Sequence, residues 1–182
     1  MSDSVVFKTQ WGWMGLTASE KGVSAIVLPK SSRQAVVRAL PFLSGRPRSV
    51  PAKLLREAQR QIVAFLAGKR RMLDFPLDLS SGTSFQRRVW QTALRIPYGR
   101  ARSYQWIASK IGGKRYARAV GNALGANPLP LIVPCHRVVA HDASLGGFSG
   151  GLAVKRKLLS LEGTLAQLTP GTKRVARGAR RR

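Results

Sequence analysis

Residues 127–138 read NPLPLIVPCHRV, from Asn127 to Val138, and contain the only cysteine of the 182-residue chain. Prolines fix the backbone angle φ and remove amide donors, so this stretch is predicted to be a rigid extended strap and not a helix. Its apolar centre, Leu131-Ile132-Val133, is expected to be buried. The polar residues that follow, Cys135-His136-Arg137, are expected to form the wall of a cleft.

Cys135 is a candidate nucleophile because His136 follows it directly. A free thiol has a pKa of about 8.5, so little thiolate exists at neutral pH unless a neighbouring base or positive charge favours it. His136 is the candidate base, and Arg137 supplies a positive charge. A lone cysteine is more often a small buried apolar residue than a nucleophile, but these two neighbours favour the reactive interpretation.

The composition predicts a protein that works on a polyanion. The chain has 32 Lys and Arg residues against seven Asp and Glu residues, which gives a net charge of +25. An excess of this size is typical of nucleic-acid-binding proteins. A membrane surface is the alternative, but the basic residues are spread along the chain and no apolar run approaches the roughly 20 residues that span a bilayer.

The same composition limits the compartment and the cofactors. No signal peptide is visible after Met1, which predicts a cytoplasmic protein that associates with the nucleoid by binding DNA. The single cysteine excludes an internal disulfide and fits a reducing compartment. Because His136 and His141 are the only histidines, a zinc site of the usual Cys/His kind is not expected, and no metal or other cofactor is predicted.

The first eighty residues are expected to form a scaffold. Short β-prone runs separated by turns predict a small antiparallel meander, with strands over residues 5–9, 13–18 and 23–28. A helix capped by Ser31-Ser32 is expected to run to Leu40, and apolar spacing predicts a second helix from Lys53 to Gly68. Alternation over residues 73–79 predicts an edge strand that returns to the sheet.

A second unit is expected after a boundary at residues 80–82. The run from Thr83 to Gln86 fits a capping box, and apolar spacing predicts helices over residues 85–94, 104–111, 114–124 and 153–161. Gly112-Gly113 forces a turn between the second and third of these helices. This is the outline of a helix-turn-helix whose second helix carries Arg115 and Arg118.

Two further segments carry little regular pattern. Residues 146–151, Gly-Gly-Phe-Ser-Gly-Gly, are expected to form a flexible loop that approaches a ligand closely, because glycine accepts backbone geometries closed to other residues. Residues 172–182 hold six basic residues and no acidic one. This tail is therefore predicted to be a disordered electrostatic arm.

Several short motifs together resemble one protein family. In order they read Ser103-Tyr104, Arg118-Ala119-Val120-Gly121, Asn127-Pro128, Pro134-Cys135-His136-Arg137-Val138, Ser149-Gly150-Gly151 and Glu162-Gly163. This set resembles the O6-alkylguanine-DNA alkyltransferases, also called methylated-DNA protein-cysteine methyltransferases, over residues 83–163. The resemblance implies an α+β fold, in which a small amino-terminal α/β domain with a short antiparallel sheet, residues 1–80, precedes a mostly helical domain with a winged-helix-like helix-turn-helix, residues 83–165.

The resemblance implies catalytic roles for four residues. Cys135 is implied to attack the alkyl carbon on O6 of guanine in DNA, and on O4 of thymine, and to keep the group as a thioether, so that each molecule acts once. His136 is implied to take the thiol proton through a bound water while Glu162 holds the imidazole tautomer. Tyr104 is implied to donate from its hydroxyl to the departing guanine anion.

Five more residues are implied to serve DNA or base binding: Arg118, Asn127, Arg137, Val138 and Ser149. Arg118 is implied to fill the gap that a flipped base leaves in the stack. Asn127 is implied to tie the helix-turn-helix to the strap, Val138 to line the pocket and accept from the base through its carbonyl, and Ser149 to donate its backbone amide. The implied partner is duplex DNA with alkylated bases, bound by a monomer and away from membranes.

Two other classes of function stay open at this point. A DNA-binding module, either an alkyltransferase-like damage sensor or a basic helix-turn-helix regulator, would hold DNA without reacting, but family sensors lack the reactive cysteine that this chain has. A cysteine hydrolase needs an oxyanion hole and a histidine that is normally distant in sequence. Within the family, Phe148 stands where many relatives carry Tyr, so the range of accepted alkyl groups is open. Asn122 replaces a common Gly, which offers an added phosphate or groove contact.

Overall fold

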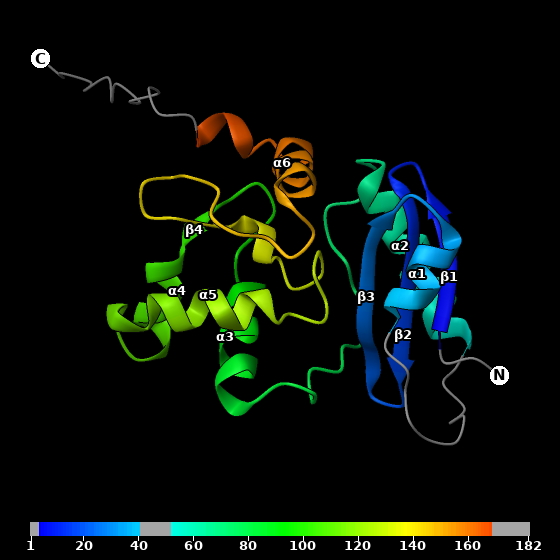
Figure 1. The fold of residues 1–182 in the computed structure, drawn as a ribbon, viewed down its shortest axis with the longest axis horizontal. Coiled ribbons are helices and arrows are strands. Elements are labelled where there is room, and N and C mark those ends of the chain that lie inside the picture. Colours follow the sequence, from blue (N-terminus) through cyan, green and yellow to red (C-terminus); the bar gives the residue numbers. More distant parts are fainter. Residues whose placement is uncertain (1–3, 41–51, 169–182) are drawn as a thin grey trace, which may run out of the picture.

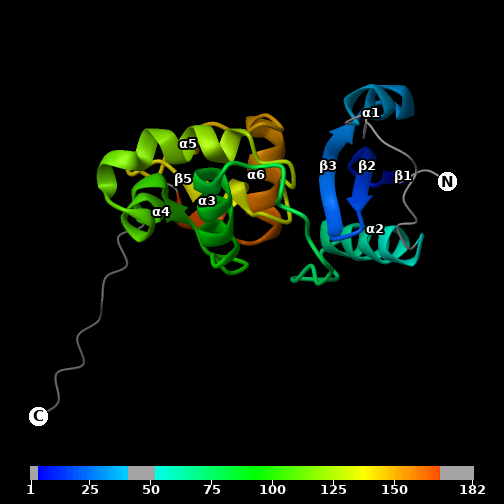
Figure 2. The same cartoon turned by 90° about the horizontal axis from the view of Figure 1, so that it is seen from below.

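The amino-terminal part is a three-stranded sheet between two helices. The structure is a computed structural model that describes residues 4–40 and 52–168. Strands β1 (Ser4–Thr9), β2 (Gly12–Ser19) and β3 (Gly22–Lys30) pair antiparallel in that order. Helices α1 (Arg33–Ala39) and α2 (Ala52–Leu66) lie on opposite faces of the sheet (Figures 1 and 2). Both faces of β2 are therefore covered, which explains why Met14 to Ala18 are all buried. The predicted meander and both predicted helices are confirmed.

The prediction of a fourth strand over residues 73–79 is wrong, because this segment is irregular. It makes a single parallel bridge, from Leu77 to Val23, in which the Val23 amide donates to the Pro76 carbonyl at 2.9 Å and the Asp78 amide donates to the Val23 carbonyl at 2.8 Å. Proline has no amide hydrogen, so Pro76 cannot continue a ladder of hydrogen bonds. The alternation of apolar residues here marks an irregular linker that packs against β3, not a strand.

Gln61 of α2 holds this linker in place. Its side chain is buried, Oε1 accepts from the Asp74 amide at 2.7 Å, and Nε2 donates to the Asp74 carbonyl at 2.9 Å. Gln61→Leu should therefore destabilise the fold by about 1–2 kcal/mol, because both backbone groups lose their protein partner. Urea denaturation measures this change. The matched control, Gln91→Leu at an exposed position of α3, should leave the midpoint nearly unchanged, and an equal shift in both variants would contradict the anchoring role.

The carboxyl-terminal part is mostly helical, as predicted. Helix α3 (Ser84–Leu94) starts at a capping box made by Thr83 and Gln86, and α4 (Tyr104–Ile111) is capped by the Ser103 hydroxyl. Gly112 and Gly113, with φ of +146° and +135°, turn the chain into α5 (Ala117–Gly125). The predicted helix over 114–124 therefore starts three residues late, because Lys114–Tyr116 form a tighter 3-10 turn.

The strap is compact instead of extended, so this prediction is wrong. The Val133 amide donates to the Leu129 carbonyl at 2.8 Å, Leu131 has a φ of +81°, and residues Cys135–Arg137 form a 3-10 turn. The prolines lack amide hydrogens, but the amides of Val133 and Arg137 still donate to the carbonyls of Leu129 and Pro134 and close two tight turns. The prediction that Leu131-Ile132-Val133 is buried is confirmed.

The strap leads into the elements that complete the second part. Strand β5 (Val138–Val139) pairs in parallel with β4 (Arg102–Ser103), and together they flank the helix-turn-helix as a small wing. Helix α6 (Leu152–Leu161) and a final 3-10 turn, Leu165–Gln167, follow. The mixed α+β class is confirmed, whereas the predicted division into residues 1–80 and 83–165 stays a prediction and the tail at 172–182 lies outside the described residues.

Strand β3 packs against the part of the chain that carries the cysteine. The Ile26 amide donates to the Pro128 carbonyl at 2.9 Å, which joins the sheet to the strap. Further along β3, Leu28 meets the glycine-rich loop so closely that a Cβ atom on Gly150 would lie 2.3 Å from Leu28 Cδ1 and 2.8 Å from Phe148 Cε1. The sheet therefore contacts both the strap and the glycine-rich loop, which border the region described next.

Candidate active site

A cavity of about 570 Å³ opens beside Cys135. This volume lies within the range of roughly 300–1,000 Å³ that is usual for small-molecule sites. Its walls come from α4, α5, the strap and the glycine-rich loop. The residues around it are Tyr104, Gln105, Ala117, Arg118, Gly121, Asn122, Leu124, Gly125, Cys135, Ala140, His141, Gly147, Phe148 and Ser149.

Asn127 holds the thiol of Cys135. The Asn127 side-chain amide donates to Cys135 Sγ at 3.2 Å and to the Val133 carbonyl at 3.1 Å, while its oxygen accepts from the Leu129 amide at 2.9 Å. Asn127 follows α5 directly, so these contacts join the helix-turn-helix to the strap. Burial raises the pKa of the Cys135 thiol, and the Asn127 hydrogen bond and the Lys155 charge partly oppose the rise. The resting group is therefore a thiol that needs a base.

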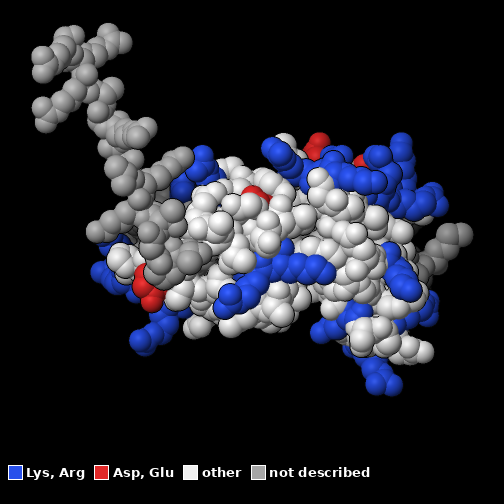
Figure 3. Space-filling view, turned by 90° about the horizontal axis from the view of Figure 1, so that it is seen from above, with Lys and Arg blue, Asp and Glu red and all other residues white. Residues whose placement is uncertain are grey.

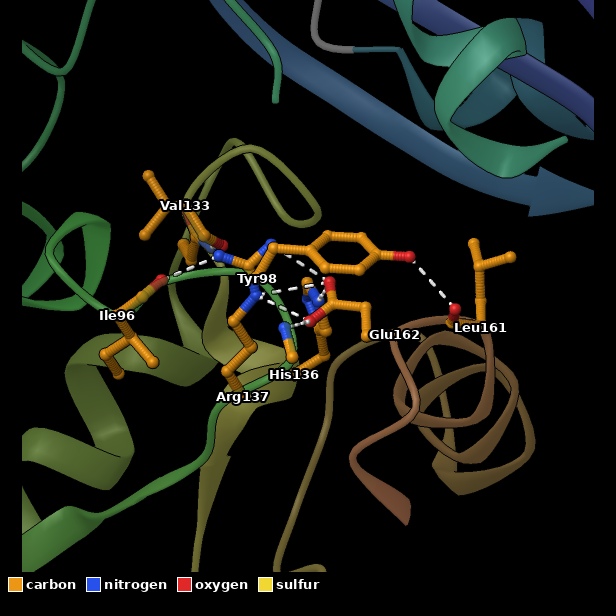
Figure 4. Close-up of polar contacts among 9 residues, drawn as sticks. Ile96, Tyr98, Val133, His136, Arg137, Leu161 and Glu162 are labelled. Carbon is orange, nitrogen blue, oxygen red and sulfur yellow. Dashed lines mark hydrogen bonds and ion pairs between the residues drawn. The ribbon is translucent and has the colours of Figure 1, made fainter. Parts of the chain in front are cut away.

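His136, Arg137 and Glu162 meet in the interior of the protein (Figure 4). His136 Nε2 lies 2.8 Å from Glu162 Oε1, and the Arg137 guanidinium donates to both oxygens of the same carboxylate. Glu162 caps the end of α6, so its place depends on how that helix packs. Both His136 and Glu162 have fully buried side chains.

The charges in this cluster fix the state of the imidazole. Burial acts to raise the pKa of Glu162, but hydrogen bonds from His136 and Arg137 outweigh it and hold the pKa below its usual value. Burial lowers the pKa of His136, against the opposing effect of Glu162. A neutral His136 beside a carboxylate must carry its proton on Nε2. Its Nδ1, which has no hydrogen-bond partner among the described residues, is then an acceptor.

Lys155 of α6 is a buried cation whose charge acts on Cys135. Its Nζ donates to the carbonyls of Val138 at 2.6 Å, Gly147 at 3.3 Å and Leu145. Burial lowers the pKa of Lys155 to about 8, and three carbonyl acceptors favour the ammonium form at neutral pH. Lys155 thus braces β5 against the glycine-rich loop and places a positive charge near the thiol.

The comparisons with known proteins agree with this geometry. Residues 84–164 match the model of the 6-O-methylguanine DNA methyltransferase DNA-binding domain. The chain is also 44% identical over 133 residues to a methylated-DNA–protein-cysteine methyltransferase of Methanosarcina barkeri, a match that covers 69% of this chain and 84% of that protein. The chain belongs to the 6-O-methylguanine DNA methyltransferase family.

Other members of the family show how far the likeness extends. A methylated-DNA–protein-cysteine methyltransferase of Mycobacterium bovis is 52% identical over 102 residues, which are 56% of this chain and 61% of that protein. A crystal structure of Mycobacterium tuberculosis OGT in complex with DNA matches with a TM-score of 0.71 and 35% identity, over 89% of this chain and 93% of that one. The methyltransferase fold therefore extends through the amino-terminal part as well.

Several residues predicted for this methyltransferase site lie around the cavity. Tyr104, Arg118 and Ser149 border it together with Cys135. The Tyr104 hydroxyl donates to the Gly147 carbonyl at 3.4 Å, and burial, followed by the nearby Cys135, raises the pKa of this phenol. Arg118 is exposed on α5, at the mouth of the cavity.

Three residues predicted to bind DNA or the base lie inside the protein. Asn127 contacts the strap and the thiol, as described above, and is buried. Val138 is fully buried away from the cavity lining, and its carbonyl already accepts from Lys155. The position of Arg137 argues against a DNA contact, because its guanidinium is bound to Glu162 and to the Ile96 carbonyl. The sequence motif placed these residues near the site but could not show whether their side chains point toward DNA or into the protein interior.

Sequence reasoning missed Lys155, Gln105 and His141. Gln105 and His141 are in the cavity wall, and neither belongs to a motif that sets it apart. Lys155 did carry a signal, because it shares one buried helical face with Leu158, Leu159 and Glu162 at intervals of three, four and seven residues. A charged residue at each end of an apolar face indicates two buried ions and not a plain packing helix.

Proposed function

We propose that Cys135 accepts the alkyl group in a repair reaction that directly reverses DNA damage. The chain is a methylated-DNA–protein-cysteine methyltransferase, and it moves a methyl or other alkyl group from O6 of guanine in DNA to a cysteine of its own. The observation that carries the assignment is the position of the only thiol of the chain in the wall of a cavity of about 570 Å³, which is large enough to admit a base. We extend the same reaction to O4 of thymine.

The step conserves atoms and charge with the groups around Cys135. The thiol proton passes to His136 Nδ1, directly or through a water molecule. Sγ then forms a bond to the alkyl carbon while the bond from that carbon to O6 breaks. Guanine leaves with the electron pair as an anion, and the proton that His136 gained neutralises it by way of solvent. Tyr104 lies in the cavity wall with Cys135 and would donate to the leaving base, and the Ser149 backbone amide would do the same for O6.

Double-stranded DNA with alkylated bases is the partner. On the face drawn in Figure 3, Lys and Arg side chains are widespread and Asp and Glu are few. The net charge of +25 favours binding to DNA phosphates. When Lys and Arg side chains neutralise the phosphates, the counterions condensed on the DNA are released. Among the described residues no helix is long and apolar enough to cross a membrane. We propose a monomer in the cytoplasm, held near the nucleoid by its affinity for DNA.

Arg118→Ala should impair repair of duplex DNA more than repair of short single strands. A base must leave the stack to reach the cavity, and an exposed arginine at its mouth would occupy the gap that remains. A single strand has no stack to refill. Single-turnover transfer rates on matched duplex and single-stranded oligonucleotides measure the difference, with Arg115→Ala as the control on the preceding turn. An equal loss on both substrates would remove this role from Arg118.

The intact mass of the protein tests the proposed function most directly. After mixing with a duplex that contains O6-methylguanine, the protein should gain the mass of one methyl group, and peptide mapping should place it on Cys135. A protein that binds the lesion without any gain in mass would be a damage sensor. Repeated release of product with an unmodified thiol would indicate a hydrolase-like mechanism.

A further inference from the structure

Every nitrogen of the Arg137 guanidinium is bound inside the protein. Nε donates to Glu162 Oε1 at 3.1 Å and to Oε2 at 2.9 Å, and Nη2 donates to Oε1 at 2.9 Å. The remaining nitrogen, Nη1, donates to the Ile96 carbonyl at 2.7 Å. The planar guanidinium also lies 5.8 Å from the centre of the Tyr98 ring. This side chain is only 10% exposed, so it is held in one orientation.

The Glu162 carboxylate is correspondingly saturated with donors. Besides Arg137 it contacts His136 Nε2 at 2.8 Å, and its Oε2 accepts from the Gly99 amide at 3.2 Å. A buried carboxylate without a cation tends to take up a proton, because burial disfavours the charged form. Within residues 4–40 and 52–168, Arg137 supplies the one cation that is paired with this carboxylate irrespective of the state of His136.

Protonation of Glu162 would reverse the hydrogen bond to His136. A carboxylic acid can donate its proton to Nε2, which then acts as an acceptor. In a neutral imidazole the other nitrogen, Nδ1, would then carry the ring proton and could no longer accept one. The state of Glu162 therefore decides whether His136 can take the proton from Cys135.

We propose that Arg137 is a positioning residue for alkyl transfer: it keeps Glu162 as a carboxylate against His136 Nε2 and so leaves His136 Nδ1 as the proton acceptor. Arg137 acts through two other side chains and touches neither the cysteine nor the substrate. This inference rests on the proposed function, because it assigns a part of the same reaction. It replaces the predicted contact between Arg137 and DNA.

The proposal predicts a shift in the pH profile of transfer. The charged groups that face His136 are Glu162, Arg137 and Lys155, and the Tyr98 phenol lies close to Glu162. Without the guanidinium, protonation of Glu162 becomes easier, and so does protonation of His136 while Glu162 is charged. Both events remove the acceptor. The acid limb of the rate should therefore move to higher pH, by roughly one unit or more.

The test is a double-mutant cycle in the full-length protein. Single-turnover rates on saturating methylated duplex are measured across a pH series for wild type, Arg137→Met, Arg137→Lys, Glu162→Gln and the Arg137→Met/Glu162→Gln pair. Near neutral pH, Arg137→Met should lower the rate on the order of 10- to 100-fold, and Arg137→Lys should recover part of it. In the Glu162→Gln background Arg137→Met should have little further effect. Affinity for DNA should not change.

The controls separate this role from folding and from DNA binding. Arg95→Met, at an exposed position next to Ile96, should keep the wild-type rate and profile. If Arg137→Met does not fold, Arg137→Lys takes its place in the cycle: Arg137→Lys alone tests the acid limb, and the Arg137→Lys/Glu162→Gln pair tests additivity. Additive losses, an unmoved acid limb or a fall in DNA affinity would each overturn the proposal. Failure of the wild type to gain a methyl group would instead overturn the proposed function.

Discussion

Cys135→Ser should bind methylated duplex with wild-type affinity and transfer no alkyl group. A serine hydroxyl is far less acidic than a thiol, so a buried neutral histidine cannot ionise it to a useful extent. The hydrogen bond from Asn127 can still be made to a hydroxyl oxygen, so the strap should keep its shape. Intact mass after mixing with methylated duplex gives the transfer, and a fluorescence titration gives the affinity.

In the same experiment, each wild-type molecule should transfer one alkyl group to Cys135 and then stop. A thioether on Cys135 has no good leaving group, and the chain has no second cysteine that could take the group over. With excess damaged duplex, the repaired base should equal the protein in amount. The control is Ser160→Ala, at an exposed position of α6, which should repair to the same endpoint. Full activity in Cys135→Ser, or product well beyond one equivalent, would contradict transfer to this thiol.

Lys155→Met should lower the transfer rate by about 100-fold near neutral pH, because a shift of about two pKa units in the thiol lowers the thiolate fraction by that factor. The substitution removes the charge that favours the Cys135 thiolate and leaves the carbonyls of Val138 in β5, Leu145 and Gly147 without this donor. The contribution of the Lys155 charge to the transfer rate should depend on pH in a direction that can be tested. Below a pH of about 8 the wild-type lysine is charged, and above it the charge is lost. The ratio of wild-type to variant rates should therefore be largest at acidic and neutral pH and should shrink as the pH rises through 8.

Lys157→Met is the matched control for this prediction. Lys157 lies two residues away on α6, is exposed, and stacks on Trp11 with its Nζ 4.2 Å from the ring centre. It should change the rate little at any pH. A ratio for Lys155→Met that stays constant across the pH series would assign the loss to bracing of the loop alone. No loss at all would remove Lys155 from the site.

Local signals in the sequence predicted most of the fold because they act over a few residues. Ser32, Thr83 and Ser103 each satisfy amide groups at a helix start, and Gly112-Gly113 can only be a turn, so these boundaries did not depend on the rest of the chain. The predictions for residues 73–79 and for the strap were wrong because the conformation of these segments depends on contacts with distant parts of the chain. Alternation and proline content limit the backbone conformations that a segment can adopt, whereas the part of the fold that it packs against selects one of them.

The candidate site was only partly predictable because its geometry is long-range. The motif supplied Cys135 and His136 as neighbours, but His136 meets Glu162, 26 residues away, through the packing of α6. The inward direction of Arg137 follows from that same meeting, since a buried carboxylate attracts the nearest guanidinium. A residue pattern that reads Cys-His-Arg cannot show which of its side chains turns toward DNA and which toward the core.

The contact of β3 with the glycine-rich loop has a consequence for laboratory evolution of new alkyl specificities. Leu28 belongs to the sheet, yet a Cβ atom on Gly150 would meet both Leu28 Cδ1 and Phe148 Cε1, and Phe148 is part of the cavity wall. A larger or smaller side chain at position 28 would move the loop and with it the width of the cavity. A library restricted to the reactive half of the chain would omit this adjustment, whereas one that varies Leu28 together with Phe148 would sample it.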